Sequence, residues 1–453
     1  MKKYGLGFDN ESIKESIIEN YTGRNHNLRK FIEFLNSQEN YSKIALDGEW
    51  GSGKTYFIKQ LQYVLNYDNS QNFKSVADLS SINNLKINYE VVYFDSWKYE
   101  SENIDPIILL FNLIQKELPE ATDLKFKESV IKAMELIIQF STKGRIKIQD
   151  FYDILQKEKE KDPIDEFKDA LNNYLNNIPD IERLVIIIDE LDRCKPTYAI
   201  NLLERVQHCL DNKKLTFVFS TNLSELSNTV KQIYGANFNG DSYLDRFFDY
   251  TLVLPEPNLK NYYSKIIPSE SRDLFDIANE VAKYFNFTLR QLNHYFSRIS
   301  LLKRKMNQLI NIDVCVDDNL RHYYLIKYFA PFMIALKMSN NKDYNEFLNG
   351  NKGNIIINFL KKNYSFKSEF DSIISNTKID EKSLKEGVDK SLLQCEKIIG
   401  TIYTGLFSNN ENYYNFCYPP RSDVPSTSSN GNTEEDKKYL LDIVSLIGED
   451  IEY

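Results

Sequence analysis

The sequence predicts an α/β fold: a three-layer α/β/α sandwich with a mostly parallel sheet, followed by an α-helical C-terminal region. Five short apolar runs lie within the first 260 residues and alternate with helical segments, as in parallel strands joined by crossover helices. A glycine-rich stretch separates the first run from a helical pattern. No convincing strand follows residue 260.

The five predicted strands are short runs of apolar residues at 43–47, 89–94, 184–189, 215–220 and 250–254. The third run has five consecutive apolar residues, mostly β-branched, before Asp189. Such a strand fits the interior of a parallel sheet, where helices cover both faces. Pro255 stops the last run, because proline cannot donate to a strand ladder.

The helical segments follow from the spacing of apolar residues. Residues 8–40 predict a polar helical segment, and 56–65 a helix with one apolar face. Pro196 opens a helix whose apolar residues recur at intervals of three and four. Residues 271–405 read as helices, and the apolar stretch 322–338 is interrupted by lysines, which favours a buried helix over a membrane span.

We expect a domain boundary near residue 260. Residues 1–260 would form the sheet domain, with a charged helical insertion at 105–180. Residues 261–420 would form a helical lid and effector region. The remainder, 421–453, is expected to be a flexible linker rich in Ser, Asn, Gly and acids, with a short helix at 438–446.

Composition narrows the class of protein. The chain has 453 residues, more than usually fold around a single hydrophobic core, so we expect more than one domain. The net charge of −9 gives no global attraction to nucleic acid, although a local basic patch leaves nucleic-acid binding open. The five cysteines form no C-x-x-C pair, which favours reduced thiols over zinc ligands. Without a signal peptide or a long apolar run, we expect a cytoplasmic protein, with peripheral association at a membrane left open.

The glycine-rich stretch has the spacing of a phosphate-binding loop. Residues 48–55 read G-x-x-x-x-G-K-T between a strand and a helix, and we call them the phosphate loop. Glycines let the backbone curl so that its N–H groups point at a phosphate. Lys54 supplies a charge for the β- and γ-phosphates, and Thr55 a hydroxyl for Mg²⁺. The alternative, a surface glycine turn, fits the flanking strand and helix poorly.

The residues expected to bind the nucleotide are those of the loop and its first helical turn: Gly48, Glu49, Trp50, Gly51, Ser52, Gly53, Lys54, Thr55 and Tyr56.

Two adjacent acids follow the third strand. Asp189 lies where doubly wound sheets place their chemistry, at the carboxyl end of a buried strand. We expect Asp189, together with Thr55, to hold Mg²⁺, and Glu190 to activate the attacking water. A strand-ending Asp-Glu pair on a polar loop is the alternative.

Four segments, in order, resemble motifs of the KAP family of P-loop NTPases. They are the Trp-containing phosphate loop 48–55, 93–99 (Y-F-D-S-W-K-Y), 188–194 (I-D-E-L-D-R-C) and 243–248 (Y-L-D-R-F-F). The resemblance spans about 20–300. It implies an ATPase core of the additional-strand type with ATP as nucleotide. Glu190 stands where the family more often has a second Asp. Family members often carry transmembrane helices between the nucleotide motifs and are associated with mobile elements and phage exclusion.

Three further polar residues are candidates for catalysis. Asn222 follows the fourth strand, where it would contact the γ-phosphate or water, with Thr221 as the competing choice and a loop cap as the alternative role. Arg246 is expected to act as an arginine finger, or else in a surface salt bridge. Arg290 would act from a helical lid. We expect Trp97 to pack in the core.

Together these observations predict Mg²⁺-dependent ATP hydrolysis coupled to conformational change or assembly, with self-association or a protein partner through the helical C-terminal region. A nucleotide-gated scaffold with negligible turnover is the first alternative. A P-loop kinase is the second, although no lid loop is evident after residue 254.

Overall fold

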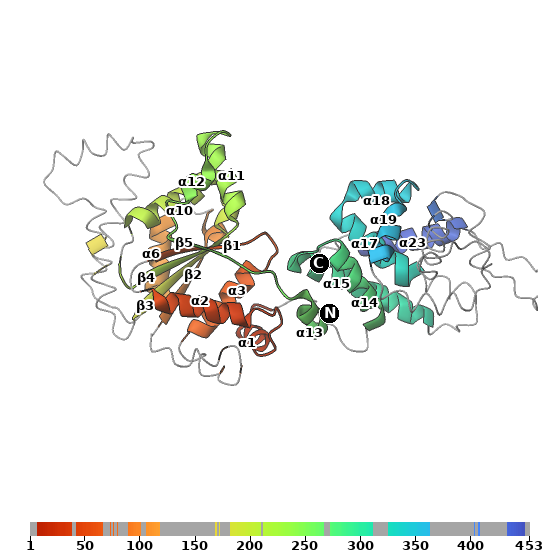
Figure 1. The fold of residues 1–453 in the computed structure, drawn as a ribbon, viewed down its shortest axis with the longest axis horizontal. Coiled ribbons are helices and arrows are strands. Elements are labelled where there is room, and N and C mark those ends of the chain that lie inside the picture. The colour runs from red at the N-terminus through yellow and green to blue at the C-terminus, as the bar shows by residue number, and fades with distance from the viewer. Residues whose placement is uncertain are drawn as a thin grey trace, which may run out of the picture. The chain divides into compact units, whose positions relative to one another are not determined.

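Five parallel strands form one sheet in the order β2-β3-β4-β1-β5 in the computed structural model (Figure 1). The strands are β1 (Ser42–Asp47), β2 (Tyr89–Asp95), β3 (Arg183–Asp189), β4 (Leu215–Thr221) and β5 (Tyr250–Val253). The α/β fold and all five predicted strands are confirmed. Because β4 lies between β1 and β3, the strand before the phosphate loop and the strand before the two acids are not neighbours.

The structure describes residues 7–38, 42–66, 89–100, 106–117, 182–209, 212–266, 272–310, 325–362 and 433–448, with 73, 76, 79, 168, 169, 172, 403, 406 and 407. Most of the predicted helical insertion at 105–180 lies outside the described residues, as does 421–432 of the predicted linker.

The strand register aligns the carboxyl ends of the central strands. Asp189 is paired with Asp95 on one side and with Ser220 on the other. Asp47 is paired with Thr221. The residues that follow these strands therefore meet at one edge of the sheet, which is where ligands bind in open α/β sheets.

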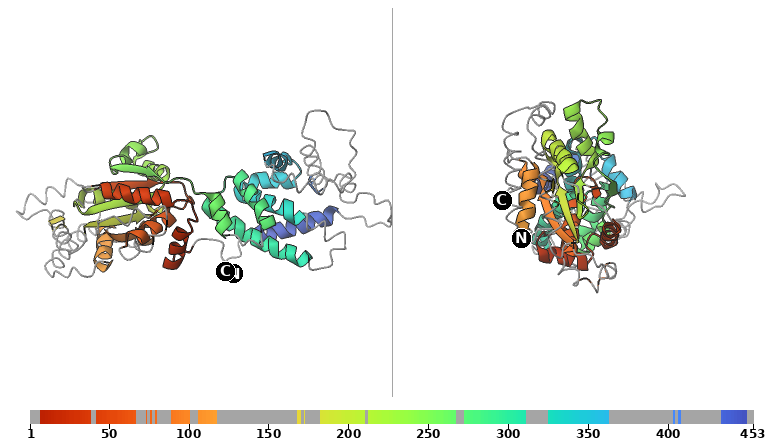
Figure 2. Two further views of the ribbon diagram at one scale, coloured as in Figure 1. Left: turned by 60° about the horizontal axis from the view of Figure 1, so that its bottom comes forward. Right: turned by 90° about the vertical axis from the view of Figure 1, so that its left-hand side faces the viewer.

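Helices cover both faces of the sheet (Figure 2). One face packs against α1 (Asn10–Ile18), α2 (Asn25–Ser37) and α3 (Lys54–Leu65), and the other against α6 (Pro106–Glu117), α10 (Pro196–Cys209) and α11 (Leu223–Tyr234). Strand β3 is buried throughout because its alternate residues enter the two cores, Ile186 into one and Ile187 into the other. The short α5 (Ser96–Tyr99) and η3 (Leu191–Arg193) follow β2 and β3 at the carboxyl edge, and the short α12 (Gly240–Leu244) packs against α11.

The segment predicted as helical over 8–40 is two helices. A turn separates α1 from α2, and both Asn20 and Gly23 have positive φ there, of 49° and 69°. Asn258 packs so closely on Gly23 that a Cβ added there would lie 2.6 Å from the Asn258 Cβ. This close approach brings the turn to the segment after β5, where the Asn258 N–H donates to the Thr22 carbonyl at 2.8 Å.

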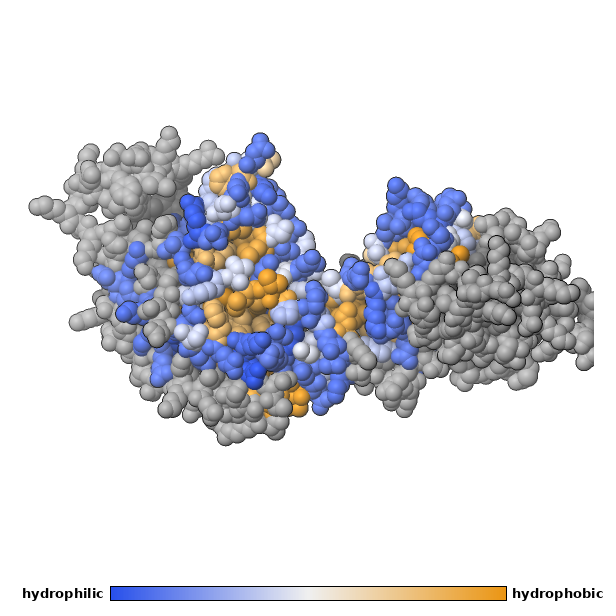
Figure 3. Space-filling view, viewed as in Figure 1, coloured by the Kyte–Doolittle hydropathy of each residue, from blue (hydrophilic) through white to orange (hydrophobic). Residues whose placement is uncertain are grey.

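The chain divides into two compact units, one covering Leu6–Tyr262 and the other Tyr263–Tyr453. The helix α13 (Leu259–Ile266) contains the boundary. Apolar residues gather on the face of the first unit seen in Figure 3. Val253 of the edge strand β5 is 70% exposed.

The described residues of the second unit form helices joined by turns, with no strand among them. Its elements are α14 (Arg272–Tyr284), α15 (Leu289–Ile310), the π-helical turn η5 (Leu325–Phe329), α17 (Ala330–Ser339), α18 (Asn341–Leu348), α19 (Asn354–Lys362) and α23 (Thr433–Gly448). The buried helix expected over 322–338 corresponds to η5 and α17. The last helix begins at Thr433, earlier than the predicted 438. Within the described ranges, no helix is long and apolar enough to cross a membrane.

Candidate functional site

The phosphate loop connects β1 to α3 and has the backbone that its sequence predicts. Gly51 and Gly53 have φ of 81° and 93°, in the left-handed region that favours glycine. Gly53 is the N-cap residue of α3, so the helix begins at Lys54. The first N–H groups of α3 have no partner within their own helix, and the helix dipole adds positive potential at this end.

Lys54 lies inside the loop, where its ammonium group donates to the carbonyls of Gly48 and Glu49, the latter at 3.1 Å. The side chain is nearly buried, and burial lowers the pKa of Lys54. The carboxylates of Asp192, Asp189 and Glu190 act in the opposite direction and favour the charged form. A buried ammonium group near three acids suits a polyanion with a bound metal, because the ammonium attracts the anion and the acids attract the metal.

Asp189 ends β3 and is almost fully buried, with 1% of its surface exposed. One carboxylate oxygen, Oδ1, accepts from the Glu190 backbone N–H at 3.0 Å. The other, Oδ2, accepts from the Tyr93 hydroxyl at 2.9 Å. These two hydrogen bonds fix the orientation of the Asp189 carboxylate.

Glu190 turns the chain sharply after the strand, with φ of 60°, one of three non-glycine residues with positive φ in the described chain. Its Oε1 accepts from the Thr55 hydroxyl at 3.4 Å. Its Oε2 lies 2.5 Å from Nε of Arg193. Strained backbone of this kind is frequent where a side chain must point into a site.

Asp192 connects the acidic turn to the phosphate loop. Its carboxylate accepts from the Trp50 indole N–H and from the Thr221 hydroxyl, the latter at 3.2 Å. Trp50 is 47% exposed, so its ring forms part of the rim of the site. The acids at 189, 190 and 192 thus each contact a different element around the loop.

The residues present fit a magnesium nucleotide. The hydroxyl of Ser52 in the loop is buried and has no hydrogen-bond partner among the described residues. No three His, Cys, Asp or Glu side chains in the described ranges gather in a way that could hold a metal ion by themselves. Mg²⁺ in nucleotide sites needs only one or two protein ligands, because phosphates and water supply the others. The Thr55 hydroxyl and the Asp189 carboxylate are oxygen ligands of the kind this role requires.

The remaining predicted residues have other contacts in the first unit or belong to the second unit. Asn222 caps α11 by accepting from the Glu225 N–H at 3.3 Å. Arg246 is exposed, and its guanidinium lies 4.8 Å from the centre of the Tyr243 ring. Arg290 is exposed on α15 of the second unit. Their catalytic roles stay predictions.

The prediction that Trp97 packs in the core is wrong. Trp97 is 56% exposed, and its ring lies 5.9 Å from the Arg193 guanidinium. It belongs to the one-turn helix α5 beyond the end of β2, where Phe94 and Tyr99 stack on each other and take the core positions instead.

Sequence reasoning missed Arg24 and Tyr93. Arg24 is 3% exposed and donates to the Ser52 carbonyl of the phosphate loop and to the Pro255 carbonyl after β5, each at 2.9 Å. Arg24 lies in no motif of the sequence, and the motif 93–99, which begins at Tyr93, assigns that residue no role. Their contacts depend on which strands and turns become neighbours.

A protein-family model described as the KAP family P-loop domain matches residues 24–322. This interval contains every element of the site and covers about two thirds of the chain. A comparison with curated proteins gives no match.

Proposed function

The chain belongs to the KAP family of P-loop NTPases, a membership that implies nucleotide binding and hydrolysis, and on that premise we propose that it is a Mg²⁺-dependent ATPase whose turnover is coupled to conformational change or assembly. The observation that carries the proposal is the contact between Thr55 and Glu190. It brings the metal-binding hydroxyl of the loop within 3.4 Å of the acid after β3, across 135 positions of sequence.

In this proposal the loop holds the triphosphate. Backbone N–H groups of 49–54 and the start of α3 would face the phosphate oxygens. The Lys54 ammonium would exchange its loop carbonyls for β- and γ-phosphate oxygens. Thr55 and Asp189 would hold Mg²⁺, which neutralises charge on the phosphates when it is bound.

Glu190 is the proposed general base. It would accept a proton from water as the water oxygen bonds to the γ-phosphorus and the bond to the β–γ bridging oxygen breaks, giving ADP and phosphate. In the described geometry its carboxylate is paired with Arg193 at 2.5 Å. The base must leave that pair, or share it, before it can accept a proton.

The Arg193 pair favours one alternative function, a nucleotide-gated scaffold with slow turnover. A carboxylate held in an ion pair with a guanidinium is less available to accept a proton from water. In that case ATP binding would act as a timer for assembly, and hydrolysis would serve only to end the bound state.

The test is phosphate release measured for the wild-type protein, Lys54→Ala and Glu190→Gln, each with and without DNA, RNA and a phage lysate. We expect Lys54→Ala to lose nucleotide binding, and Glu190→Gln to keep binding and lose turnover by at least about 100-fold. Hydrolysis by Glu190→Gln at the wild-type rate would reject Glu190 as the base. Slow turnover in every condition would favour the scaffold.

The proposal also names the part of the chain that would respond to ATP hydrolysis. We assign residues 261–420, predicted as a helical region, to the effector or self-association role, because they follow the sheet that carries the proposed site. A role in phage exclusion rests on family resemblance, and the phage-lysate arm of the assay tests it.

A further inference from the structure

The hydroxyl of Tyr93 is the only side-chain donor to Asp189 that the described structure records. It donates to Oδ2 at 2.9 Å, while the backbone N–H of Glu190 occupies Oδ1 at 3.0 Å. With one donor on each oxygen, the carboxylate has a single orientation. Each oxygen still has a lone pair for a further hydrogen bond, such as one from a metal-bound water.

The ring of Tyr93 also contacts the helix that follows the phosphate loop. Nζ of Lys59 lies 3.1 Å from the centre of the Tyr93 ring, over its face. Lys59 stands one helical turn after Thr55 on α3. The ring therefore connects the helix carrying Thr55 to the strand carrying Asp189, which are the two residues proposed to share the metal.

The hydrogen bond to an acid distinguishes Tyr93 from the other tyrosine on the same face of β2. Tyr89 lies on the same face of β2, four residues earlier, and its hydroxyl donates to the Asn36 side chain on α2. Both hydroxyls are satisfied, but only that of Tyr93 is directed at an acid at the carboxyl edge of the sheet. The charged groups around the Tyr93 side chain are Lys59 on α3, Asp95 on β2, Asp189 at the end of β3, and Glu190 directly after it.

We propose that Tyr93 is a positioning residue for magnesium binding: its hydroxyl holds the Asp189 carboxylate in the orientation that receives the metal of the Mg²⁺–nucleotide complex. The inference deepens the proposed function and rests on it. Donors in the outer shell of a metal site orient the ligands, and their removal typically weakens metal affinity about 10- to 100-fold.

The experiment measures binding, without turnover. Binding of a fluorescent, non-hydrolysable ATP analogue is followed by anisotropy as Mg²⁺ is titrated, and again in EDTA. We expect Tyr93→Phe to raise the half-saturating Mg²⁺ concentration about 10-fold or more, with analogue affinity in EDTA unchanged. Tyr89→Phe, which removes a hydroxyl from the same strand and face, should leave the Mg²⁺ midpoint unchanged.

A shift of less than about threefold for Tyr93→Phe, or an equal shift for Tyr89→Phe, overturns the inference, since an outer-shell donor is worth more than that. Thermal melting checks that each variant folds. The Mg²⁺ midpoint is also measured for Tyr93→Met, which fills the position without a hydroxyl. If one of the two variants does not fold, the midpoint of the other tests the inference.

Two further variants separate this inference from the proposed function. Lys54→Ala must lose analogue binding, and Asp189→Asn must lose its Mg²⁺ dependence. If either fails, the proposed site is wrong. If both behave as expected and Tyr93→Phe does not shift the midpoint, only the role of Tyr93 is rejected.

Discussion

At the residue scale, the phosphate loop depends on backbone conformations that side chains disfavour. Gly53 has φ of 93° where α3 begins. A Cβ in this region meets the neighbouring carbonyl oxygen and is strained. The loop can therefore keep this shape only with glycine at this position.

Gly53→Ala is expected to destabilise the fold by about 1–3 kcal/mol and to abolish nucleotide binding, because the strained residue would relax by moving the N–H groups of the loop. Gly235→Ala is the matched control. Gly235 has φ of 105°, and nothing lies within 4 Å of an added Cβ there. Urea unfolding should show a similar loss of stability for both variants, whereas only Gly53→Ala should lose binding. Equal binding by both would show that the loop tolerates the change.

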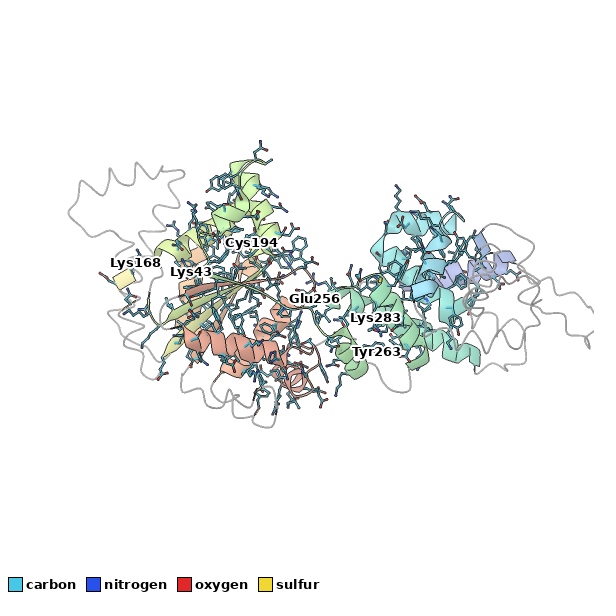
Figure 4. The ribbon with its side chains drawn as sticks, in the orientation of Figure 1. Lys43, Lys168, Cys194, Glu256, Tyr263 and Lys283 are labelled. Carbon is cyan, nitrogen blue, oxygen red and sulfur yellow. The ribbon has the colours of Figure 1, made fainter. Side chains whose placement is uncertain are left out.

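Cys194, labelled in Figure 4, shows how burial controls reactivity. It ends the turn that holds the acids and is 5% exposed. Burial raises the pKa of the Cys194 thiol well above its usual range, and the nearby carboxylates Glu100 and Asp192 raise it further. A thiol of this kind is almost never ionised at neutral pH.

Native protein at pH 8 should therefore leave Cys194 unmodified by iodoacetamide, and protein in denaturant should be modified fully. Peptide-resolved mass spectrometry measures this site separately from the other cysteines. Rapid native labelling would show that the turn around Asp192 opens.

How far single residues could be predicted depends on where their partners lie in the sequence. The phosphate loop and Asp189 were predictable, because the residues that define each of these motifs are consecutive in the sequence. The contact of Tyr93 with Asp189 was not, because it exists only once β2 pairs with β3. Trp97 was placed in the core by residue type alone, whereas the end of β2 leaves it exposed.

At the scale of elements, Arg24 connects three parts of the first unit. It precedes α2, and its guanidinium donates to the carbonyls of Ser52 and Pro255. Burial lowers the pKa of Arg24 to about 10, so it remains charged at neutral pH. Glu256, next to Pro255 and labelled in Figure 4, partly offsets that shift. The phosphate loop is thus fixed to the segment leading out of the sheet.

Arg24→Gln should destabilise the first unit by about 2–4 kcal/mol, because two buried carbonyls lose charged donors. Arg29→Gln is the matched control on the same helix. Its ion pair with Glu33 is 3.7 Å long and partly exposed, so its loss should cost no more than about 1 kcal/mol. Chemical denaturation of both variants measures the difference. A loss below about 1 kcal/mol for Arg24→Gln would mean that water replaces its donors.

The strands were easier to predict than the helices, and the reason is physical. A parallel strand buried on both faces must be apolar throughout, as β3 is, and this is visible in the sequence. The break between α1 and α2 is set instead by the approach of Asn258 to Gly23, a contact between residues far apart in sequence. No local pattern contains that contact.

At the scale of the whole molecule, a series of contacts connects the phosphate loop to the segment that precedes the second unit. Ser52 is joined through Arg24 to Pro255, and the Asn258 N–H is bonded to Thr22. Residues 255–258 precede α13, which contains the boundary between the two units. A change in the loop on nucleotide binding would therefore alter the segment that enters the helices.

The expected outcome is that nucleotide changes amide hydrogen exchange beyond the sheet unit. In Glu190→Gln with ATP and Mg²⁺, peptides covering 255–266 and α14 should exchange more slowly than without nucleotide. The expected slowing is about 10-fold or more, which corresponds to an increase of about 1.4 kcal/mol in the free energy of amide opening. Lys54→Ala should show no change, and Arg24→Gln should confine protection to the phosphate loop and α3. Protection that stops before residue 255 in Glu190→Gln would show that the helical unit does not respond to the nucleotide, and the coupling would then have to involve a surface of the sheet unit itself.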